Sequence, residues 1–113
     1  MSKTNKVIIT VALCGNGTTK AMNPNVPEQP DELAADIVRC AKAGAAIAHI
    51  HVRDKDGKAT MSTEVFKEVC DKARAACAEA GVDICLNLTT SGSRFTWEER
   101  MGQLKECLPE MCT

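Results

Sequence analysis

The amino-acid sequence predicts an α/β fold of the (β/α)8 barrel class. Apolar, β-branched runs alternate with amphipathic segments of helical length, which is typical of right-handed βαβ crossovers and a parallel sheet. The strands are expected to begin near residues 7, 46, 83 and 110. Eight units of this length approach the roughly 250–300 residues of such a barrel. The 113 residues are therefore expected to cover about the first three βα units and the start of strand 4 of one barrel domain.

A doubly wound sheet is the alternative architecture, but its usual dinucleotide fingerprint is missing. Residues 15–20 read Gly-Asn-Gly-Thr-Thr-Lys, which gives G-x-G-x-x-K where the fingerprint needs G-x-G-x-x-G. A polar loop with prolines at positions 24, 27 and 30 follows, so no helix starts directly after these glycines.

The first unit opens with a continuous apolar run at residues 7–14, the pattern of a strand buried on both faces. A helix is expected from Pro30, because proline suits the first helical position and Asp31 and Glu32 favour the positive end of the helix dipole. Gly44 is expected to end this helix. Its apolar face comprises Leu33, Ile37, Cys40 and Ala41.

The second unit has a strand at residues 46–52 and a turn at residues 54–57. Ser62 or Thr63 caps a helix over residues 64–80, which Gly81 closes. The apolar face of this helix comprises Val65, Phe66, Val69, Cys70, Ala73, Ala76 and Cys77.

The third unit has a strand at residues 83–89 and a polar loop at residues 90–93. Residues 96–99 form a capping box that starts a helix ending near residue 107. Residues 109–113 then have the pattern of the opening of a fourth strand.

The composition excludes several classes of function. The chain has 14 Lys+Arg against 15 Asp+Glu and no basic run, so it lacks the charge of a nucleic-acid surface. Its three aromatic residues are too few for a base-stacking platform. The first apolar run, residues 7–13, is too short for a signal peptide or a membrane span. We expect a soluble, cytoplasmic protein with neither nucleic acid nor membrane as a partner.

Seven cysteines stand at positions 14, 40, 70, 77, 85, 107 and 112. Their number is odd and no pair has the C-x-x-C spacing, which argues against a disulfide framework and against a zinc ribbon. Most of them are expected to be small buried side chains in a reducing compartment.

The only two histidines, His49 and His51, lie two residues apart at the carboxyl end of the second predicted strand. Side chains at i and i+2 of a strand point to the same face, and α/β folds build their sites at the carboxyl ends of strands. Two imidazoles there are suited to bind one zinc ion, with a third ligand from another strand end. The alternative is a pair of core histidines. Asp54 is a further possible ligand, although its position favours the turn at residues 54–57.

The third predicted strand places Cys85, Asn87 and Thr89 on one face, beside the histidines, and Ile84, Leu86 and Leu88 on the face toward the helices. Amide and hydroxyl groups at Asn87, Thr89 and Thr90 are suited to bind a carbonyl or a carboxylate of a substrate. The alternative for residues 90–93 is a polar turn without a ligand.

Several motifs in this order resemble the N-terminal part of the β-keto acid cleavage enzyme family, whose named member acts on 3-keto-5-aminohexanoate. The most specific is His49-Ile50-His51-Val52-Arg53-Asp54. The others are Ile9-Thr10-Val11-Ala12-Leu13 with Gly15 and Thr18-Thr19, Asn23-Pro24-Asn25-Val26-Pro27, Ala43-Gly44-Ala45-Ala46, Leu88-Thr89-Thr90-Ser91-Gly92 and Pro109-Glu110-Met111.

The resemblance implies a zinc-dependent (β/α)8 barrel, homo-oligomeric when full length. Such an enzyme condenses a β-keto acid with acetyl-CoA and cleaves the product to acetoacetate and a new CoA ester. It implies that His49 and His51 are zinc ligands and that Thr89 and Thr113 contact the substrate. The resemblance further implies a glutamate as the third zinc ligand and an Asp/Arg pair as the base. Both lie on late strands beyond residue 113. No catalytic residue is therefore expected within these residues.

The loop after the first strand departs from the family member that acts on the amino-substituted acid. That member has a glutamate where this chain has Gly15-Asn16-Gly17, so we expect a neutral or anionic keto acid instead. The alternative to a catalytic role is a truncated product, inactive alone, that survives as a partial barrel or an interaction partner. A coding region that continues past Thr113 favours the enzyme, and a stop codon there favours the truncated product.

Overall fold

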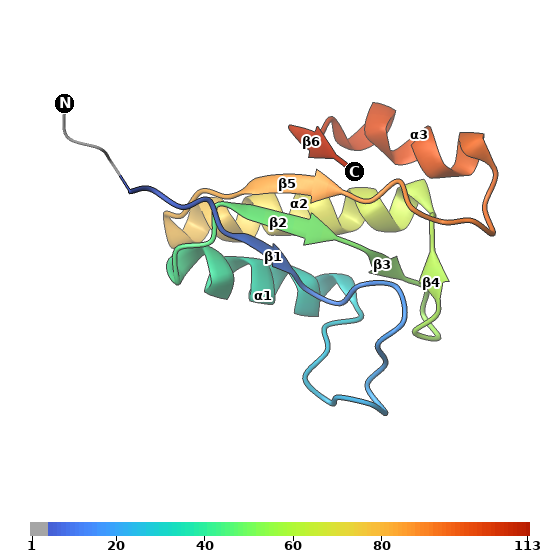
Figure 1. Cartoon of the computed structure of the whole chain (residues 1–113), viewed down its shortest axis with the longest axis horizontal. Helices are drawn as coiled ribbons and strands as arrows, with labels where there is room; N and C mark the ends of the chain where they lie inside the picture. The colour runs from blue at the N-terminus through green and yellow to red at the C-terminus, as the bar shows by residue number, and fades with distance from the viewer. Residues whose placement is uncertain (1–4) are drawn as a thin grey trace.

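The computed structural model describes residues 5–113, and a four-stranded parallel sheet lies at its centre (Figure 1). The strands are β1 (Thr10–Ala12), β2 (Ile47–Ile50), β5 (Cys85–Leu88) and β6 (Met111–Cys112), in that order across the sheet. Every pairing between these neighbours is parallel. The predicted α/β class and the parallel sheet are thus confirmed.

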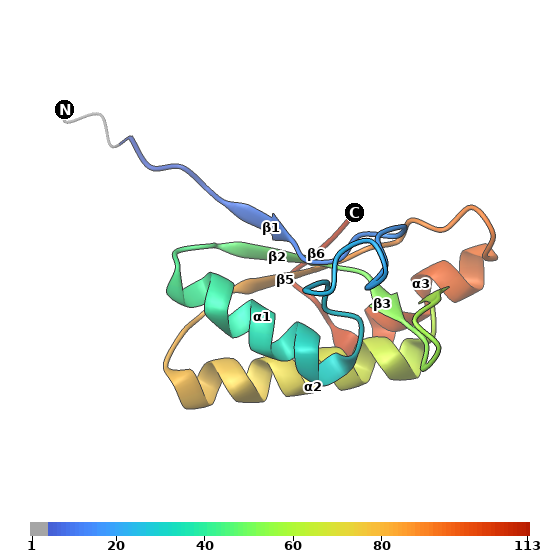
Figure 2. The same ribbon diagram turned by 90° about the horizontal axis from the view of Figure 1, so that it is seen from below.

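Three helices connect these strands: α1 (Pro30–Lys42), α2 (Thr63–Ala80) and α3 (Trp97–Cys107). Figures 1 and 2 show α1 and α2 against one face of the sheet, and α3 packs beside α2. Crossovers of one hand that advance in one direction across a sheet place their helices on the same face. The other face carries no helix from the described part of the chain.

The prediction of a long first strand buried on both faces was wrong. β1 spans only Thr10–Ala12, and the side chains of Val7, Ile8 and Ile9 are 82%, 74% and 53% exposed. β1 is an edge strand that pairs with β2 alone, and one of its faces is not covered by a helix. Apolar composition therefore predicted the strand but not its burial.

The second predicted strand, at residues 46–52, is two strands in the structure. β2 ends at Ile50, and β3 (Val52–Arg53) leaves the sheet to pair with β4 (Ala59–Thr60) in an antiparallel hairpin. The turn predicted at residues 54–57 closes this hairpin, with the Asp54 amide donating to the Lys58 carbonyl at 2.8 Å. Strands of two residues are too short to show the alternation of apolar and polar residues from which a strand is predicted.

The helix boundaries follow the capping signals. α1 begins at Pro30, and the Glu32 carboxylate accepts a hydrogen bond from the Gln29 amide at 2.9 Å. The Ser62 hydroxyl caps α2 by accepting from the Val65 amide, and Gly81 ends that helix with φ of 68°. The Thr96 and Glu99 capping box at the start of α3 is present as predicted.

The core lies between the helices and the covered face of the sheet. Leu33 and Ile37 of α1 and Phe66 of α2 are fully buried there, as predicted, whereas Cys40 and Val65 are half-buried. Ala48, Ile50, Leu86 and Leu88 contribute the sheet side of the core. Four of the seven cysteines (Cys14, Cys70, Cys77 and Cys107) are buried, and all seven are free thiols. Within residues 5–113, we find no helix with the length and apolar content that a membrane crossing requires.

Candidate functional site

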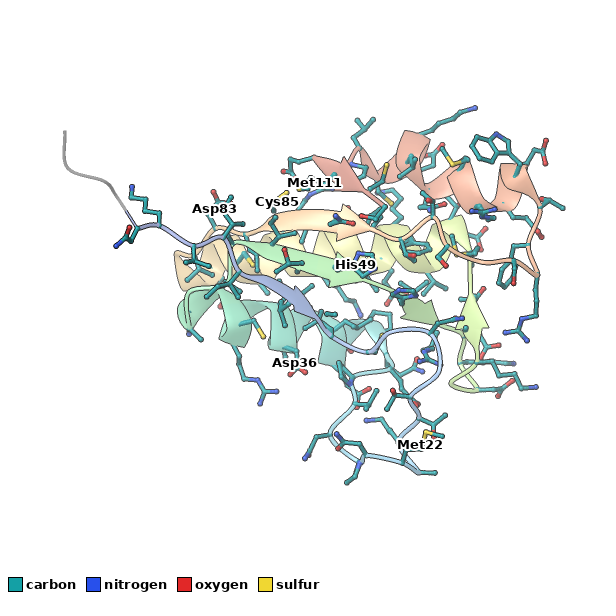
Figure 3. All side chains as sticks on the ribbon, in the orientation of Figure 1. Met22, Asp36, His49, Asp83, Cys85 and Met111 are labelled. Carbon is teal, nitrogen blue, oxygen red and sulfur yellow. The ribbon has the colours of Figure 1, made fainter. Side chains whose placement is uncertain are left out.

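The two histidines lie on the uncovered face of the sheet. Along β2, Ala48 and Ile50 are buried against the helices, while His49 and His51 alternate with them and are half-buried. Figure 3 shows His49 in the middle of the sheet, on the side turned away from α1 and α2. The predicted common face for the two imidazoles is therefore confirmed.

The two rings converge on one point. Nε2 of His49 lies 3.2 Å from Nε2 of His51, and the ring planes are inclined by 76°. Two nitrogens that share a tetrahedral zinc ion at 2.0–2.1 Å are separated by about 3.3 Å. The spacing of this donor pair therefore fits one zinc ion.

The side chain of Asn87, on the neighbouring strand β5, determines which nitrogen of His49 is free. Its Oδ1 lies 3.0 Å from Nδ1 of His49 and accepts a hydrogen bond from the Thr113 hydroxyl at 2.9 Å. Because this oxygen is an acceptor, Nδ1 of His49 carries the proton and Nε2 presents its lone pair. This arrangement is the one that a metal-binding histidine needs.

The surroundings of His51 also favour a neutral ring. Burial, followed by the neighbouring His49 and Arg53, holds the pKa of His51 below its ordinary value of 6.5. A neutral ring keeps a lone pair for a metal ion at pH 7. The backbone carbonyl of His51 accepts a weak hydrogen bond from the Cys14 thiol at 3.4 Å.

The predicted substrate-binding residues do not all share one environment. Asn87 and Thr113 lie together beside His49 through the hydrogen bonds given above. The Thr89 side chain is buried, and its hydroxyl accepts from the Ser91 amide at 3.1 Å. Thr90 donates from its amide to the Thr113 carbonyl at 2.6 Å, so the loop after β5 is tied to the end of β6.

Two buried polar residues that the sequence interpretation did not assign hold these loops. Gln103 of α3 is fully buried and donates to the Thr89 carbonyl at 3.0 Å. Arg53 is 3% exposed and donates to the carbonyls of Gly15 and Thr18 at 3.0 Å each. Arg53 follows the histidines at the same two-residue spacing, but β3 leaves the sheet, so the strand period did not predict its burial.

The structure brings together two potential metal ligands and no third one among the residues that it describes. Among residues 5–113, no group of three or more His, Cys, Asp or Glu side chains gathers closely enough to hold a metal ion. Asp54 belongs to the hairpin turn, since its Oδ1 accepts from the amides of Asp56 and Lys58 at 2.9 Å each. The histidine pair therefore stands without a third potential ligand among the described residues.

Comparison with known proteins identifies the family. Residues 6–113 match the family model described as beta-keto acid cleavage enzyme. The chain belongs to this family. Within it, the chain is 34% identical to 3-dehydrocarnitine:acetyl-CoA trimethylamine transferase of Rhizobium meliloti, over 100% of this chain and 43% of that protein.

Two further relatives have similar identity. The 3-keto-5-aminohexanoate cleavage enzyme of Fusobacterium nucleatum is 37% identical over 96% of this chain and 38% of its own length. The 3,5-dioxohexanoate:acetyl-CoA acetone transferase of Paraburkholderia graminis is 37% identical over 100% of this chain and 36% of its own length. The chain therefore spans about two fifths of the length of these beta-keto acid cleavage relatives.

Proposed function

We propose that the chain is the N-terminal part of a zinc-dependent beta-keto acid cleavage enzyme. This enzyme exchanges acyl groups between a β-keto acid and acetyl-CoA and releases acetoacetate and a new CoA ester. The observation that carries the proposal is the 3.2 Å approach of the two histidine Nε2 atoms in a member of this family. The acetyl-CoA in the names of two relatives supports the choice of co-substrate.

The proposed whole fold is a (β/α)8 barrel. Two features support it: the strand order follows the sequence, and the helices lie on one face of the sheet. A doubly wound sheet would place helices on both faces. β1 and β6 each have one open edge, and barrel closure would pair both edges with further strands.

His49 and His51 would hold the zinc ion, and a third ligand would come from outside residues 1–113. When bound, the ion would supply a Lewis acid for the keto oxygen of the substrate. Asn87 would keep His49 in its metal-binding tautomer through the 3.0 Å contact.

Substrate contacts are proposed for the same face of the sheet. The Oδ1 atom of Asn87 is engaged by His49 and Thr113, which leaves its Nδ2 to donate to a substrate carbonyl or carboxylate. The Thr113 hydroxyl lies next to this amide and supplies a second polar group. Thr89 and Thr90 would line the end of β5, where Gln103 and the Thr113 carbonyl hold their backbone.

The names of the relatives contain different keto acids, and the loop after β1 is the feature of this chain that favours one substrate class. Residues 15–19 contain no carboxylate, and the Arg53 guanidinium lies against the carbonyls of Gly15 and Thr18. An ammonium group placed here would meet a cation instead of an acidic partner. We therefore propose a neutral or anionic β-keto acid.

The test is an assay of a full-length form that contains these 113 residues. Acetyl-CoA is mixed with a panel of β-keto acids, and acetoacetate and the new CoA ester are measured together. We expect acetoacetate and the new CoA ester to form in equal molar amounts, and we expect His49→Ala to abolish both. A full-length form that binds zinc through His49 and His51 but forms neither product from any acid would contradict the enzymatic role. The absence of a longer coding region would favour the truncated, non-catalytic alternative.

A further inference from the structure

A side chain of α3 holds the peptide that follows β5. Gln103 is fully buried, and its Nε2 donates to the Thr89 carbonyl at 3.0 Å and to the Arg100 carbonyl of its own helix at 2.8 Å. Figure 1 shows the chain leave β5 through a loop and return as α3. Gln103 therefore ties the end of β5 to the helix that the loop leads into.

The Thr89 carbonyl and the Thr90 N–H belong to one peptide group, and both are hydrogen-bonded. In a trans peptide these two groups point in opposite directions. Because Gln103 holds the carbonyl, the N–H is directed to the Thr113 carbonyl, which lies 2.6 Å from the Thr90 nitrogen. The hydroxyl of Thr113 in turn donates to Asn87 beside the histidine pair. Through one peptide, Gln103 thus acts on a residue of the candidate site.

The next peptide is held from the same helix. Arg100 is half-buried, and its Nε donates to the Thr90 carbonyl at 2.6 Å. The N–H of this peptide belongs to Ser91, points the other way and donates to the Thr89 hydroxyl at 3.1 Å. Because the hydroxyl accepts this bond, its own hydrogen is left to donate to a substrate. The Arg100 contact therefore sets the hydrogen-bonding role of Thr89.

Packing alone does not account for an amide at position 103. Within residues 5–113, the Oε1 atom of Gln103 is buried and has no hydrogen-bond partner. A buried acceptor without a partner costs free energy, and an apolar side chain of the same length would avoid that cost. What the amide adds is the donor to the Thr89 carbonyl, which an apolar side chain cannot supply. The contact that requires glutamine at this position is thus the contact to the loop after β5.

We propose that Gln103 and Arg100 are positioning residues of the substrate site. Their hydrogen bonds go to backbone carbonyls, so they act through the two peptides that flank Thr90. The inference rests on the proposed function, which places Thr89 and Thr113 against the keto acid. Loss of either α3 side chain should therefore impair binding of the keto acid and leave binding of acetyl-CoA unchanged.

The first measurement is amide hydrogen exchange of the 113-residue chain, which needs no substrate. The variants are Gln103→Met, which keeps the length of the side chain without its donor, and Arg100→Met at a half-buried position. In both variants we expect the Thr90 amide to exchange about tenfold faster. The Thr89 amide donates to the Ile50 carbonyl at 3.1 Å in the sheet, and it should keep its wild-type rate.

The matched control is Cys107→Ala. Cys107 is buried on the same helix, one turn beyond Gln103, and its carbonyl accepts from Arg74 of α2 at 2.8 Å. This control removes packing from α3 and leaves the contacts to the loop in place, so it should affect the Thr89 and Thr90 amides alike. An unchanged Thr90 rate in both variants would overturn the inference. Equal acceleration of the two amides in the variants would also overturn it, because the residues would then have a structural role only.

The second measurement is steady-state kinetics of a full-length form with acetyl-CoA and the most active β-keto acid of a panel. Gln103→Met should raise KM for the keto acid about tenfold and leave KM for acetyl-CoA unchanged. If the wild type is active and the variant changes neither KM, or both equally, the inference is overturned and the proposed function stands. If the wild type forms neither product, the proposed function fails and the substrate role fails with it, while the exchange rates still decide whether the two residues hold the loop.

Discussion

Nδ1 of His49 lies 3.0 Å from the side-chain oxygen of Asn87, and this contact joins neighbouring strands of the parallel sheet. The two residues are register partners, so the pairing of β2 with β5 itself brings them together. The contact places the proton on Nδ1 and leaves the Nε2 of His49, 3.2 Å from the Nε2 of His51, with its lone pair. The register between β2 and β5 thus determines which ring nitrogen of His49 carries the proton in the proposed metal site.

Removal of the Asn87 oxygen is expected to weaken the site without removing a ligand. Asn87→Ala should convert His49 to a mixture of tautomers and lower its zinc affinity about 10- to 100-fold. Asn87→Asp retains an acceptor oxygen and should preserve the Nδ1-protonated form. Imidazole nitrogen chemical shifts measure the tautomer, and a zinc titration followed by the same signals measures the affinity. An unchanged tautomer in Asn87→Ala would show that this contact does not orient His49.

Because α2 packs against the sheet, truncation of a core side chain of this helix should strongly lower the free energy of unfolding. Phe66 is fully buried, so Phe66→Ala should lower the free energy of unfolding by about 3–5 kcal/mol. Trp97→Ala is the matched control, because that side chain is 65% exposed and its loss should change stability by less than about 0.5 kcal/mol. Urea denaturation followed by circular dichroism gives both values. Similar losses for the two variants would contradict the assigned core.

Helix and strand order were predictable because they depend on local signals. Pro30, Ser62 and the Thr96–Glu99 box define helix starts through the backbone groups that they satisfy, and each predicted start lies within one residue of the observed one. The common face of His49 and His51 followed from the strand period alone. These features need no knowledge of distant contacts.

The features that were missed depend on tertiary context. The exposure of Val7 and Ile8 reflects the edge position of β1 within residues 5–113, and in the proposed barrel the strand that pairs with this edge comes from outside them. The burial of Arg53 depends on loop carbonyls 35 and 38 residues away in sequence. Gln103 likewise anchors a loop 14 residues upstream. Long-range partners of this kind are visible only once the fold is known.

The charge of Glu32, at the start of α1, is expected to stabilise the fold at neutral pH and to lose this effect at low pH. A hydrogen bond from the Lys20 ammonium, followed by those from the Gln29 and Glu28 amides, lowers the pKa of Glu32 from 4.5 to about 2. A carboxylate with a lowered pKa in the folded state stabilises the fold above pH 4.5, and this contribution is lost as the pH falls through about 2.

The variant that tests this is Glu32→Gln. It should be less stable than the wild type at pH 7 by less than about 1 kcal/mol, because the Lys20 pair is partly exposed. Denaturation midpoints compared from pH 7 to pH 2 should converge at the acidic end. A difference that stays constant over this range would mean that the charge of Glu32 does not contribute to stability.

The loop after β1 leads to a prediction about the substrate. A full-length form is expected to prefer a neutral or anionic β-keto acid over the 5-amino acid, because residues 15–19 offer no carboxylate and Arg53 lies behind them. The measurement is kcat/KM for both acids with acetyl-CoA. Gly17→Glu, which places a carboxylate in this loop, should shift the ratio toward the aminated acid. A preference of the wild type for the aminated acid would contradict this account of the loop.

The 113-residue chain itself is expected to bind zinc weakly and to form no CoA ester. A catalytic zinc ion normally has three protein ligands, and in the proposed site the histidine pair would supply two of them. No base is proposed within these residues to move a substrate proton. Turnover by this chain that disappears in His49→Ala/His51→Ala would show that the site needs no external third ligand.

The most direct test of the central claim is a zinc titration of this chain followed by the imidazole nitrogen signals. The chain has two histidines, so every such signal belongs to His49 or His51, and a zinc ion held by cysteines alone makes no bond to either ring. Both Nε2 signals should shift together and saturate at one zinc ion per histidine pair, while Nδ1 of His49 stays protonated. A shift of one ring alone, or of neither ring while the cysteines take up the metal, would contradict the central claim.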